Sequence, residues 1–257
     1  MSLSFEERKK LILEYLEREE KIQVRVVAKI LDVSGETIRR DLDRLEKEGI
    51  LKKVYGGAVK AKNSIELPFD QKTTMNALEK RAICKAAAGL VEDGDVIMIG
   101  HGTTAFEIVR FLNDKKNVTV ITPSVPVLLL AMEVFDGQII FIGGEYEREQ
   151  KFTSGPLAEM IVSKLRANKA FVAAGGLSIN DGITDYDLHG SSSSRKLMQR
   201  AEDVIVLADH TKFGKSTFAH VSSLTDASMI ITDKPCSNEW EKTLAENEIE
   251  LLIADDL

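Results

Sequence analysis

The first 60 residues place hydrophobic side chains at the spacing that one face of a helix requires. This pattern predicts helices over residues 5–20 and 24–32, and a third helix that is capped by Ser34 and ends near Gly49. Serine is typical before a helix and glycine just after one. The side chains that we expect on the buried faces are Leu11, Ile12, Tyr15 and Leu16 in the first helix, Val27, Ile30 and Leu31 in the second, and Ile38, Leu42 and Leu45 in the third.

Two short strand-like stretches follow the third helix. They cover residues 50–55 and 56–59, and the pair Gly56-Gly57 lies between their apolar positions. Such an arrangement predicts a small hairpin with a glycine turn. Three helices followed by a hairpin form a winged helix-turn-helix.

Beyond residue 76, continuous apolar runs alternate with helical patterns. Strands that are buried on both faces have this character, so the fold class is predicted to be α/β, with a parallel sheet covered by helices. We expect a head at 1–60, a polar linker at 61–76 and an α/β body at 77–257. The expected strands are 96–99, 118–121, 139–142, 170–173, 204–208, 229–232 and 249–253, and the expected helices are 78–92, 104–113, 125–135, 156–166, 193–202 and 237–247.

The net charge of −7 is unevenly distributed. Residues 1–60 hold 14 Lys or Arg against 12 Asp or Glu, which gives the head a net charge of +2 and the rest of the chain −9. A slightly basic head on an acidic body indicates two modules with different partners.

The composition excludes several classes of protein. No apolar run approaches the ~18 residues of a membrane helix, and the charged N-terminus lacks the apolar segment of a signal peptide. Cys84 and Cys236 are too far apart in sequence to indicate a metal cluster or a disulfide scaffold. We therefore expect a cytoplasmic protein that works without a membrane, a metal or a cofactor.

The third helix has the features of a helix that reads DNA. Its apolar side chains face the core, which leaves a polar face at its start. The first turns of a recognition helix enter the major groove, where arginine pairs with guanine. A solvated helix explains the same charges when the segment is taken alone, but the complete winged helix-turn-helix favours DNA. The expected contacts are Ser34, Thr37, Arg39 and Arg40 on the helix, and Lys52, Lys53 and Tyr55 on the wing.

The strand at 96–99 runs into Gly100-His101-Gly102-Thr103-Thr104-Ala105. Glycines, free amides and threonine hydroxyls before a helix favour a bound anion, although a tight turn with a threonine cap is the simpler alternative. The loop also fits a dinucleotide fingerprint, but residues 120–124 supply no carboxylate for a ribose. The pattern therefore favours a small phosphorylated ligand over NAD.

Further polar residues lie near the ends of other predicted strands, which meet at the same edge of a parallel sheet. Lys212 and Lys80 offer charges for a phosphate, although a solvated lysine explains Lys80 equally well. His101 is either a sugar contact or a packing residue. The expected effector contacts are Lys80, His101, Gly102, Thr103, Thr104, Ser124, Asp181, Asp187 and Lys212.

Both parts of the chain resemble the DeoR family of bacterial sugar-metabolism repressors. The resemblance rests on residues 33–42 (VSGETIRRDL) and Gly56-Gly57-Ala58 in the head, and on Gly102-Thr103-Thr104 and residues 209–214 (DHTKFG) in the body. It implies an effector domain that is similar in fold to ribose-5-phosphate isomerase, and an operator complex released by a phosphorylated sugar. It also implies phosphate contacts at Gly102, Thr103, Thr104 and Lys212.

The main expectation is a repressor of a carbohydrate operon, acting as a homodimer or homotetramer on operator duplex DNA and responding to a phosphorylated sugar or polyol. The alternative is a sugar-phosphate isomerase-like enzyme with an appended DNA-binding module, and a regulator that has lost its sensing is a third possibility. Asp181, Asp185 and Asp187 could form a catalytic cluster, but an Asp- and Gly-rich turn is the commoner explanation. The segment after 170–173 carries no carboxylate before Asp181, so no catalytic residue is expected.

Overall fold

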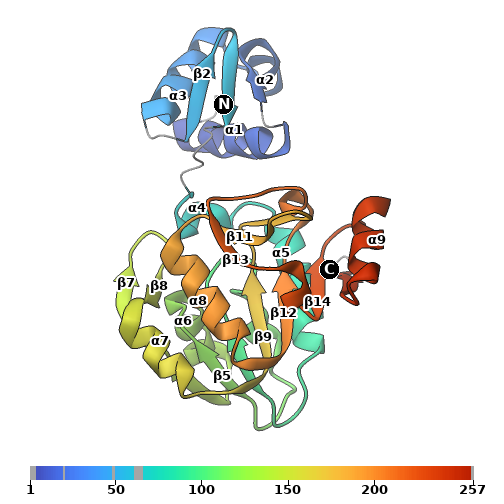
Figure 1. Ribbon diagram of the computed structural model, residues 1–257. Coiled ribbons are helices and arrows are strands. Elements are labelled where there is room, and N and C mark those ends of the chain that lie inside the picture. The colour runs from blue at the N-terminus through green and yellow to red at the C-terminus, as the bar shows by residue number, and fades with distance from the viewer. Residues whose placement is uncertain (1–3, 20, 48–49, 61–65, 256–257) are drawn as a thin grey trace. The chain divides into compact units, whose positions relative to one another are not determined.

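The computed structural model describes residues 4–19, 21–47, 50–60 and 66–255. Contacts within the chain separate two compact units, residues 1–67 and residues 68–257, and Figure 1 shows the fold of each. Below, these units are called the head and the body.

The head is a winged helix-turn-helix, as predicted. Its three helices are followed by the wing hairpin, and a short strand that the sequence pattern did not predict joins this hairpin in an antiparallel sheet of order β1-β3-β2. Ile22 of β1 pairs with Ala58, and Gln23 pairs with Gly57. The elements are α1 (Phe5–Glu19), β1 (Lys21–Gln23), α2 (Val24–Ile30), α3 (Gly35–Lys47), β2 (Leu51–Val54) and β3 (Gly57–Lys60).

Most of the expected core of the head is confirmed. Eight of the ten expected side chains pack in one cluster, and Tyr15 among them is partly buried. The expected burial of Leu11 and Ile30 is wrong, because 38% and 59% of their surfaces are exposed. In α1 the buried stripe includes Leu13 instead, and in α2 the residues at 24, 27, 28 and 31 follow the helical period more closely than Ile30 does. The expected end of the third helix near Gly49 lies outside the described residues.

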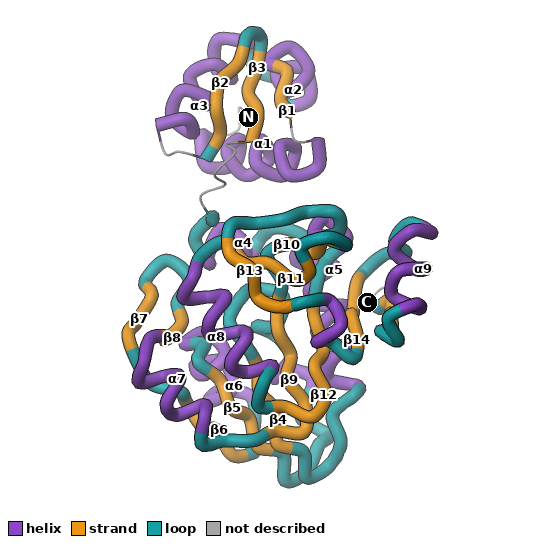
Figure 2. The backbone as a smooth tube through the Cα atoms, viewed as in Figure 1, coloured by secondary structure: helices purple, strands orange, loops and turns teal. Residues whose placement is uncertain are grey.

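The body is built on a seven-stranded parallel sheet of order β15-β14-β12-β9-β4-β5-β6. All seven strands were predicted from their apolar runs, and Figure 2 shows β4, β5, β9 and β12 side by side. The strands are β4 (Val96–Ile99), β5 (Thr119–Thr122), β6 (Gln138–Phe141), β9 (Ala167–Ala173), β12 (Ala201–Leu207), β14 (Met229–Thr232) and β15 (Glu250–Ile253).

Helices cover both faces of this sheet. Along β4, Ile97 and Ile99 belong to one buried cluster with α5, η1 and α6, whereas Met98 points to the opposite cluster, which includes α7 and α8. None of the described helices is both long and apolar enough to cross a membrane. The helices are α5 (Ala77–Gly89), the 3-10 helix η1 (Ile108–Phe111), α6 (Val125–Val134), α7 (Gly155–Ser163), α8 (Leu188–Met198) and α9 (Asn238–Glu246).

Several small elements were not predicted. The polar segment 61–76, which we expected to be a linker, contains helix α4 (Phe69–Thr73), and its residues 61–65 lie outside the described part of the chain. A second sheet of order β10-β11-β13 and a hairpin of β7 and β8 accompany the main sheet. Their bounds are β7 (Glu145–Glu147), β8 (Phe152–Ser154), β10 (Gly176–Ser178), β11 (Gly182–Asp185) and β13 (Ala219–Ser222), and the short 3-10 helices η2 (His210–Lys212) and η3 (Leu224–Asp226) flank β13.

Candidate functional site

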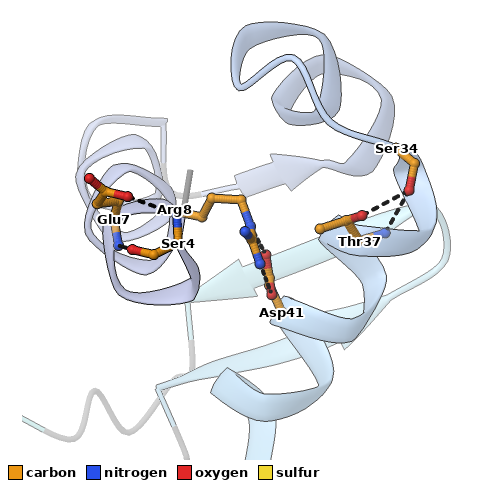
Figure 3. A network of polar contacts seen from close by, with 6 residues as sticks. All are labelled: Ser4, Glu7, Arg8, Ser34, Thr37 and Asp41. Carbon is orange, nitrogen blue, oxygen red and sulfur yellow. Dashed lines mark hydrogen bonds and ion pairs between the residues drawn. The ribbon is translucent and has the colours of Figure 1, made fainter. Parts of the chain in front are cut away.

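Helix α3 begins with the cap that the sequence predicted. The Thr37 amide donates to Ser34 Oγ at 3.1 Å, and the hydroxyls of Ser34 and Thr37 lie 2.9 Å apart (Figure 3). Arg39 and Arg40 follow on the exposed side, and Arg39 Nη1 lies 3.2 Å from the exposed Glu36 carboxylate. The polar start of α3 is therefore well formed and accessible.

An ion pair between α1 and α3 fixes this helix in the head. Arg8 Nε and Nη2 donate to the two carboxylate oxygens of Asp41 at 2.6 and 3.0 Å, and Figure 3 shows this fork. Asp41 is buried, and its hydrogen bond raises the pKa of Arg8. Sequence reasoning missed this pair. Arg8 and Asp41 lie in different helices, and no local pattern indicates that their side chains meet.

The three wing residues differ in their surroundings. Lys52 and Tyr55 are exposed, with Tyr55 at the turn between β2 and β3. Lys53 instead forms an ion pair with Asp43 of α3, and its amide donates to Glu46 Oε1 at 2.7 Å. The hydrogen bond to Asp43 raises the pKa of Lys53. Lys53 therefore ties the wing to α3, and it can meet a phosphate only by leaving or sharing Asp43.

In the body, the loop after β4 differs from the prediction. A helix was expected over 104–113, but residues 103–107 form turns and only Ile108–Phe111 is helical, as the 3-10 helix η1. The Ile108 amide donates to the Ala105 carbonyl, one residue short of the α-helical bond, and the Thr104 carbonyl accepts a bond from Cys84 Sγ at 2.9 Å. An anion here would thus meet loop amides and side chains rather than the start of an α-helix.

Lys80 of α5 lies against this loop and is almost fully buried. Its Nζ donates to Thr103 Oγ1 at 2.9 Å and to the Lys72 carbonyl of α4 at 2.7 Å. Burial lowers the pKa of Lys80 to about 8. Because a buried cation costs free energy unless a partner compensates it, this site favours a negatively charged ligand.

Asp209 and Lys212 complete the charges around Lys80. Asp209 is buried, and it caps η2 by accepting the Thr211 amide at 3.0 Å. Burial raises the pKa of Asp209, but the charge of Lys212, the bond from the Thr211 hydroxyl and the charge of Lys80 outweigh it and hold the pKa below its usual range. Lys212 is half-buried, with Nζ 6.0 Å from the centre of the Tyr186 ring.

His101, in the loop after β4, is held by Asp185 at the end of β11. The two side chains are buried, and His101 Nε2 lies 3.2 Å from Asp185 Oδ2. The imidazole stacks on Phe152, with ring centres 4.2 Å apart. Burial raises the pKa of Asp185, but the His101 bond and charge outweigh it and leave the pKa lowered. We had not placed Asp185 among the effector contacts, and only the fold brings it beside His101.

Gly190 of α8 lies where these groups meet Asp187. A Cβ on Gly190 would be 2.9 Å from both His101 Nε2 and Asp185 Oδ2, and 3.0 Å from Asp187 Oδ2. Asp187 also caps α8, because its Oδ1 accepts the amides of His189 and Gly190. The structure thus brings His101 and Asp187 together, as expected of residues at one site.

A Gly190→Ala variant will be less stable than the parent, although alanine ordinarily stabilises a helix by about 0.5–1 kcal/mol over glycine. The added methyl must displace buried polar side chains, and overpacking of this kind costs about 1–3 kcal/mol. Gly89→Ala is the matched control, since nothing lies within 4 Å of its Cβ position in α5. In denaturant unfolding, the unfolding free energy should fall for Gly190→Ala and rise for Gly89→Ala. A stabilised Gly190→Ala would contradict the packing described here.

Two expected contacts are used elsewhere. Ser124 is buried and caps α6, since its Oγ accepts the Val127 amide at 3.4 Å. Asp181 is exposed and accepts bonds from the hydroxyls of Ser178 and Ser216. It borders a hollow of about 670 Å³ whose described lining includes none of residues 101–104. The structure therefore separates Asp181 from the loop after β4.

Comparisons with known proteins agree with this division of the chain. Residues 8–64 match the model of a DeoR-like helix-turn-helix domain, and residues 75–234 match that of the DeoR C-terminal sensor domain. Together these matches cover the recognition helix, the wing and the loop after β4.

Curated relatives are similar over nearly their whole length. The HTH-type transcriptional regulator IolR of Bacillus subtilis (strain 168) is 31% identical over 94% of this chain and 96% of its own. GolR of Listeria innocua, also a transcriptional regulator, is 31% identical over 97% and 98%. The transcriptional repressor CsqR of Escherichia coli (strain K12) is 26% identical over 90% and 88%.

Among solved structures, ribose 5-phosphate isomerase A of Methanocaldococcus jannaschii is similar over 54% of this chain and 55% of its own, with 21% identity and a TM-score of 0.40. This likeness is too distant to bear on activity. The two domain matches and the full-length relatives decide the family instead. The chain belongs to the DeoR family and is a DNA-binding transcriptional regulator.

Proposed function

We propose that this regulator represses a carbohydrate operon and leaves its operator when a phosphorylated sugar or polyol binds the body. The observation that carries the effector part is the buried Lys80 ammonium, which lies 2.9 Å from Thr103 Oγ1 on the loop after β4. The two hydrogen-bond acceptors of Lys80 Nζ, the Lys72 carbonyl and the Thr103 hydroxyl, are neutral. Lys80 and Lys212 together place two positive charges near the single carboxylate of Asp209. A phosphate would balance the remaining positive charge.

The phosphate would lie among Gly102, Thr103, Thr104, Lys80 and Lys212. Gly102 has a φ of +103°, a conformation that favours glycine and that turns the chain sharply after β4. The hydroxyls of Thr103 and Thr104 and the two ammonium groups are donors that suit phosphate oxygens. The chain beyond residue 60 carries a net charge of −9, so its overall field does not attract an anion. The local donors must therefore supply the attraction.

The sugar would extend toward His101 and Asp187. Asp187 Oδ2 and the His101–Asp185 pair surround Gly190, so hydrogen-bonding groups converge on one place without crowding by a side chain. Carboxylate oxygens accept hydrogen bonds from hydroxyl groups, which suits a polyol chain. Ser124 and Asp181 are left out of this arrangement because of their other contacts.

The DNA part of the proposal uses the exposed residues of α3 and the wing. Arg39 and Arg40 would read base edges, Ser34 and Thr37 would meet phosphates, and Lys52 and Tyr55 would contact the backbone beside the groove. One head offers too small a surface for tight binding, so we propose a homodimer or homotetramer on repeated half-sites.

We also propose that the body does not catalyse a reaction. Proton transfer on a sugar needs a base positioned at the reacting carbon, and carboxylates are common in that role. The described loop after β9 reads Ala174-Gly175-Gly176 and offers none, Asp185 is buried against His101, and Asp187 accepts the amides at the start of α8. A binding site that holds its ligand unchanged agrees with these observations.

A release experiment tests the effector. The full chain selects a duplex from a random pool, and the complex is titrated with sugar phosphates and with the same sugars lacking phosphate. We expect release by a sugar phosphate only, and we expect that the compound is recovered unchanged. Release by the unphosphorylated sugar at the same concentration would contradict the phosphate site.

The Lys212→Ala variant localises that site. It will bind the selected duplex as tightly as the parent but will need about 10- to 100-fold more sugar phosphate for release, the usual effect of losing one hydrogen bond to a charged group. Lys85→Ala is the matched control, because Lys85 is exposed on α5. An unchanged response of Lys212→Ala would show that the phosphate binds elsewhere.

A further inference from the structure

Helix α4 is the first element of the body after the head, and it packs on the loop after β4. The Phe69 ring, at the start of α4, lies edge-on to the Phe106 ring, with centres 5.7 Å apart and an interplanar angle of 83°. Phe69 is 4% exposed, and Phe106 belongs to the turns that follow Thr103 and Thr104. A movement of this loop therefore bears directly on the segment by which the chain enters the body.

Lys80 connects the same two elements. Its Nζ donates to the Lys72 carbonyl of α4 at 2.7 Å as well as to Thr103 Oγ1 at 2.9 Å. An ammonium forms stronger hydrogen bonds with a charged acceptor than with a carbonyl. The third N–H of the Lys80 ammonium is available to an anion at Thr103, and such an anion would pull Nζ toward itself and weaken the bond to the Lys72 carbonyl.

Helix α4 also rests on the β7–β8 hairpin, which forms its seat. The Phe69 amide donates to the Glu149 carbonyl at 2.8 Å, and Lys151 Nζ lies 2.6 Å from Asp70 Oδ1. On α4 itself, Gln71 Oε1 is buried and has no hydrogen-bond partner among the described residues. A buried polar atom without a partner destabilises the position that contains it. The docked position of α4 is thus opposed by one unsatisfied group.

We propose that α4 transmits effector binding to the DNA-binding head. An anion beside Thr103 draws Lys80 Nζ away from the Lys72 carbonyl, and α4 loosens from the loop and from the seat that fixes the entry of the chain. The effector then favours the loosened position because it binds that position better, which is the condition for any ligand-driven shift. This inference rests on the phosphate site proposed above.

Hydrogen exchange on the full chain tests the coupling, with inorganic phosphate as the probe and sodium chloride at equal ionic strength as the reference. We expect slower exchange of the amides at 102–104 and about fivefold faster exchange of the amides at 69–75, the effect of losing one hydrogen bond. The measurement needs no knowledge of the operator or of the sugar.

Two variants change α4 without touching the phosphate site. Gln71→Met removes the unsatisfied oxygen and should hold α4 in its seat, so that phosphate protects the loop while α4 exchanges slowly. Phe69→Leu keeps an apolar side chain but loses the ring contact, and α4 should exchange fast even without phosphate. Lys85→Ala is the control, because Lys85 is exposed on α5 and belongs neither to α4 nor to the β7–β8 hairpin, and it should respond as the parent does.

The outcomes separate this inference from the phosphate site. If phosphate protects residues 102–104 and leaves exchange at 69–75 unchanged, the coupling is wrong and the site stands. If Gln71→Met and Phe69→Leu both respond like the parent, the coupling is also wrong. If phosphate changes exchange in neither segment, the phosphate site fails, and this inference fails with it.

Discussion

A chain in which Arg39 and Arg40 are both alanine will bind its selected duplex no more tightly than an unrelated sequence. Each arginine that pairs with a base contributes about 1–3 kcal/mol of discrimination, and a two-headed assembly loses each contact twice. The specific affinity should therefore fall by at least about 1,000-fold, whereas the weaker attraction to any duplex decreases only modestly.

The fold of the head should survive this double substitution. Arg39 is 59% exposed in its side chain and forms an ion pair with Glu36, which is also exposed, and surface changes of this kind usually alter stability by less than about 0.5 kcal/mol. Arg44→Ala is the matched control, since this exposed arginine of α3 stacks on Phe5 and lies later in the helix. Binding and thermal unfolding are measured on the same samples. Specific binding that persists in the double variant would exclude this face of α3.

The second large effect concerns Lys80 and pH. Burial lowers its pKa from 10.5 to about 8 in the folded protein. Between these values the unfolded chain still holds a proton that the folded chain has lost, so the folded state gains stability as the pH rises through this window. The gain is on the order of 3 kcal/mol, at about 1.4 kcal/mol per pKa unit. A Lys80→Met variant lacks this contribution.

The unfolding free energies of the parent and of Lys80→Met are measured at pH 8 and at pH 10, and the difference between the two proteins is compared at the two pH values. The contributions of titrating groups that both proteins share cancel in this difference. Phosphate binding should change in the opposite sense, weakening by up to about tenfold per pH unit above 8, because neutral Lys80 no longer pairs with an anion. A difference that does not vary with pH would mean that Lys80 titrates as an ordinary surface lysine.

The sequence pattern predicted the main sheet well for a physical reason. Strands such as 96–99 and 204–207 are covered on both faces, so they consist of uninterrupted apolar residues that are easily recognised. The second sheet was missed because β10 and β11 are short and contain glycine, serine and aspartate. The two strands pair with each other in a local hairpin, and β11 also pairs with β13, which lies far along the chain and which no local pattern indicates.

The site was predictable where its residues share a loop and not where the fold assembles them. Gly102, Thr103 and Thr104 form a recognisable run, and Lys80, which was expected to offer a charge to a phosphate, contacts this run through Thr103. Asp185 looked like one of several turn aspartates, and only tertiary structure places it against His101. The helix expected over 104–113 does not form at its start, where the Ile108 amide bonds to the Ala105 carbonyl and the Thr104 carbonyl accepts a bond from Cys84, a contact that only the tertiary structure supplies.

Strand β1, which joins the wing hairpin, explains why the turn between β2 and β3 needs its two glycines for different reasons. Gly56 has a φ of +78° and open space around it, so its requirement is conformational, and asparagine or aspartate can meet it in part. Gly57 faces the passing strand β1, and a Cβ there would lie 1.8 Å from the Ile22 carbonyl oxygen. No side chain fits unless β1 separates from β3. A selection for working repressors that starts from random codons at both positions should therefore return a small set of residues at 56 and glycine alone at 57.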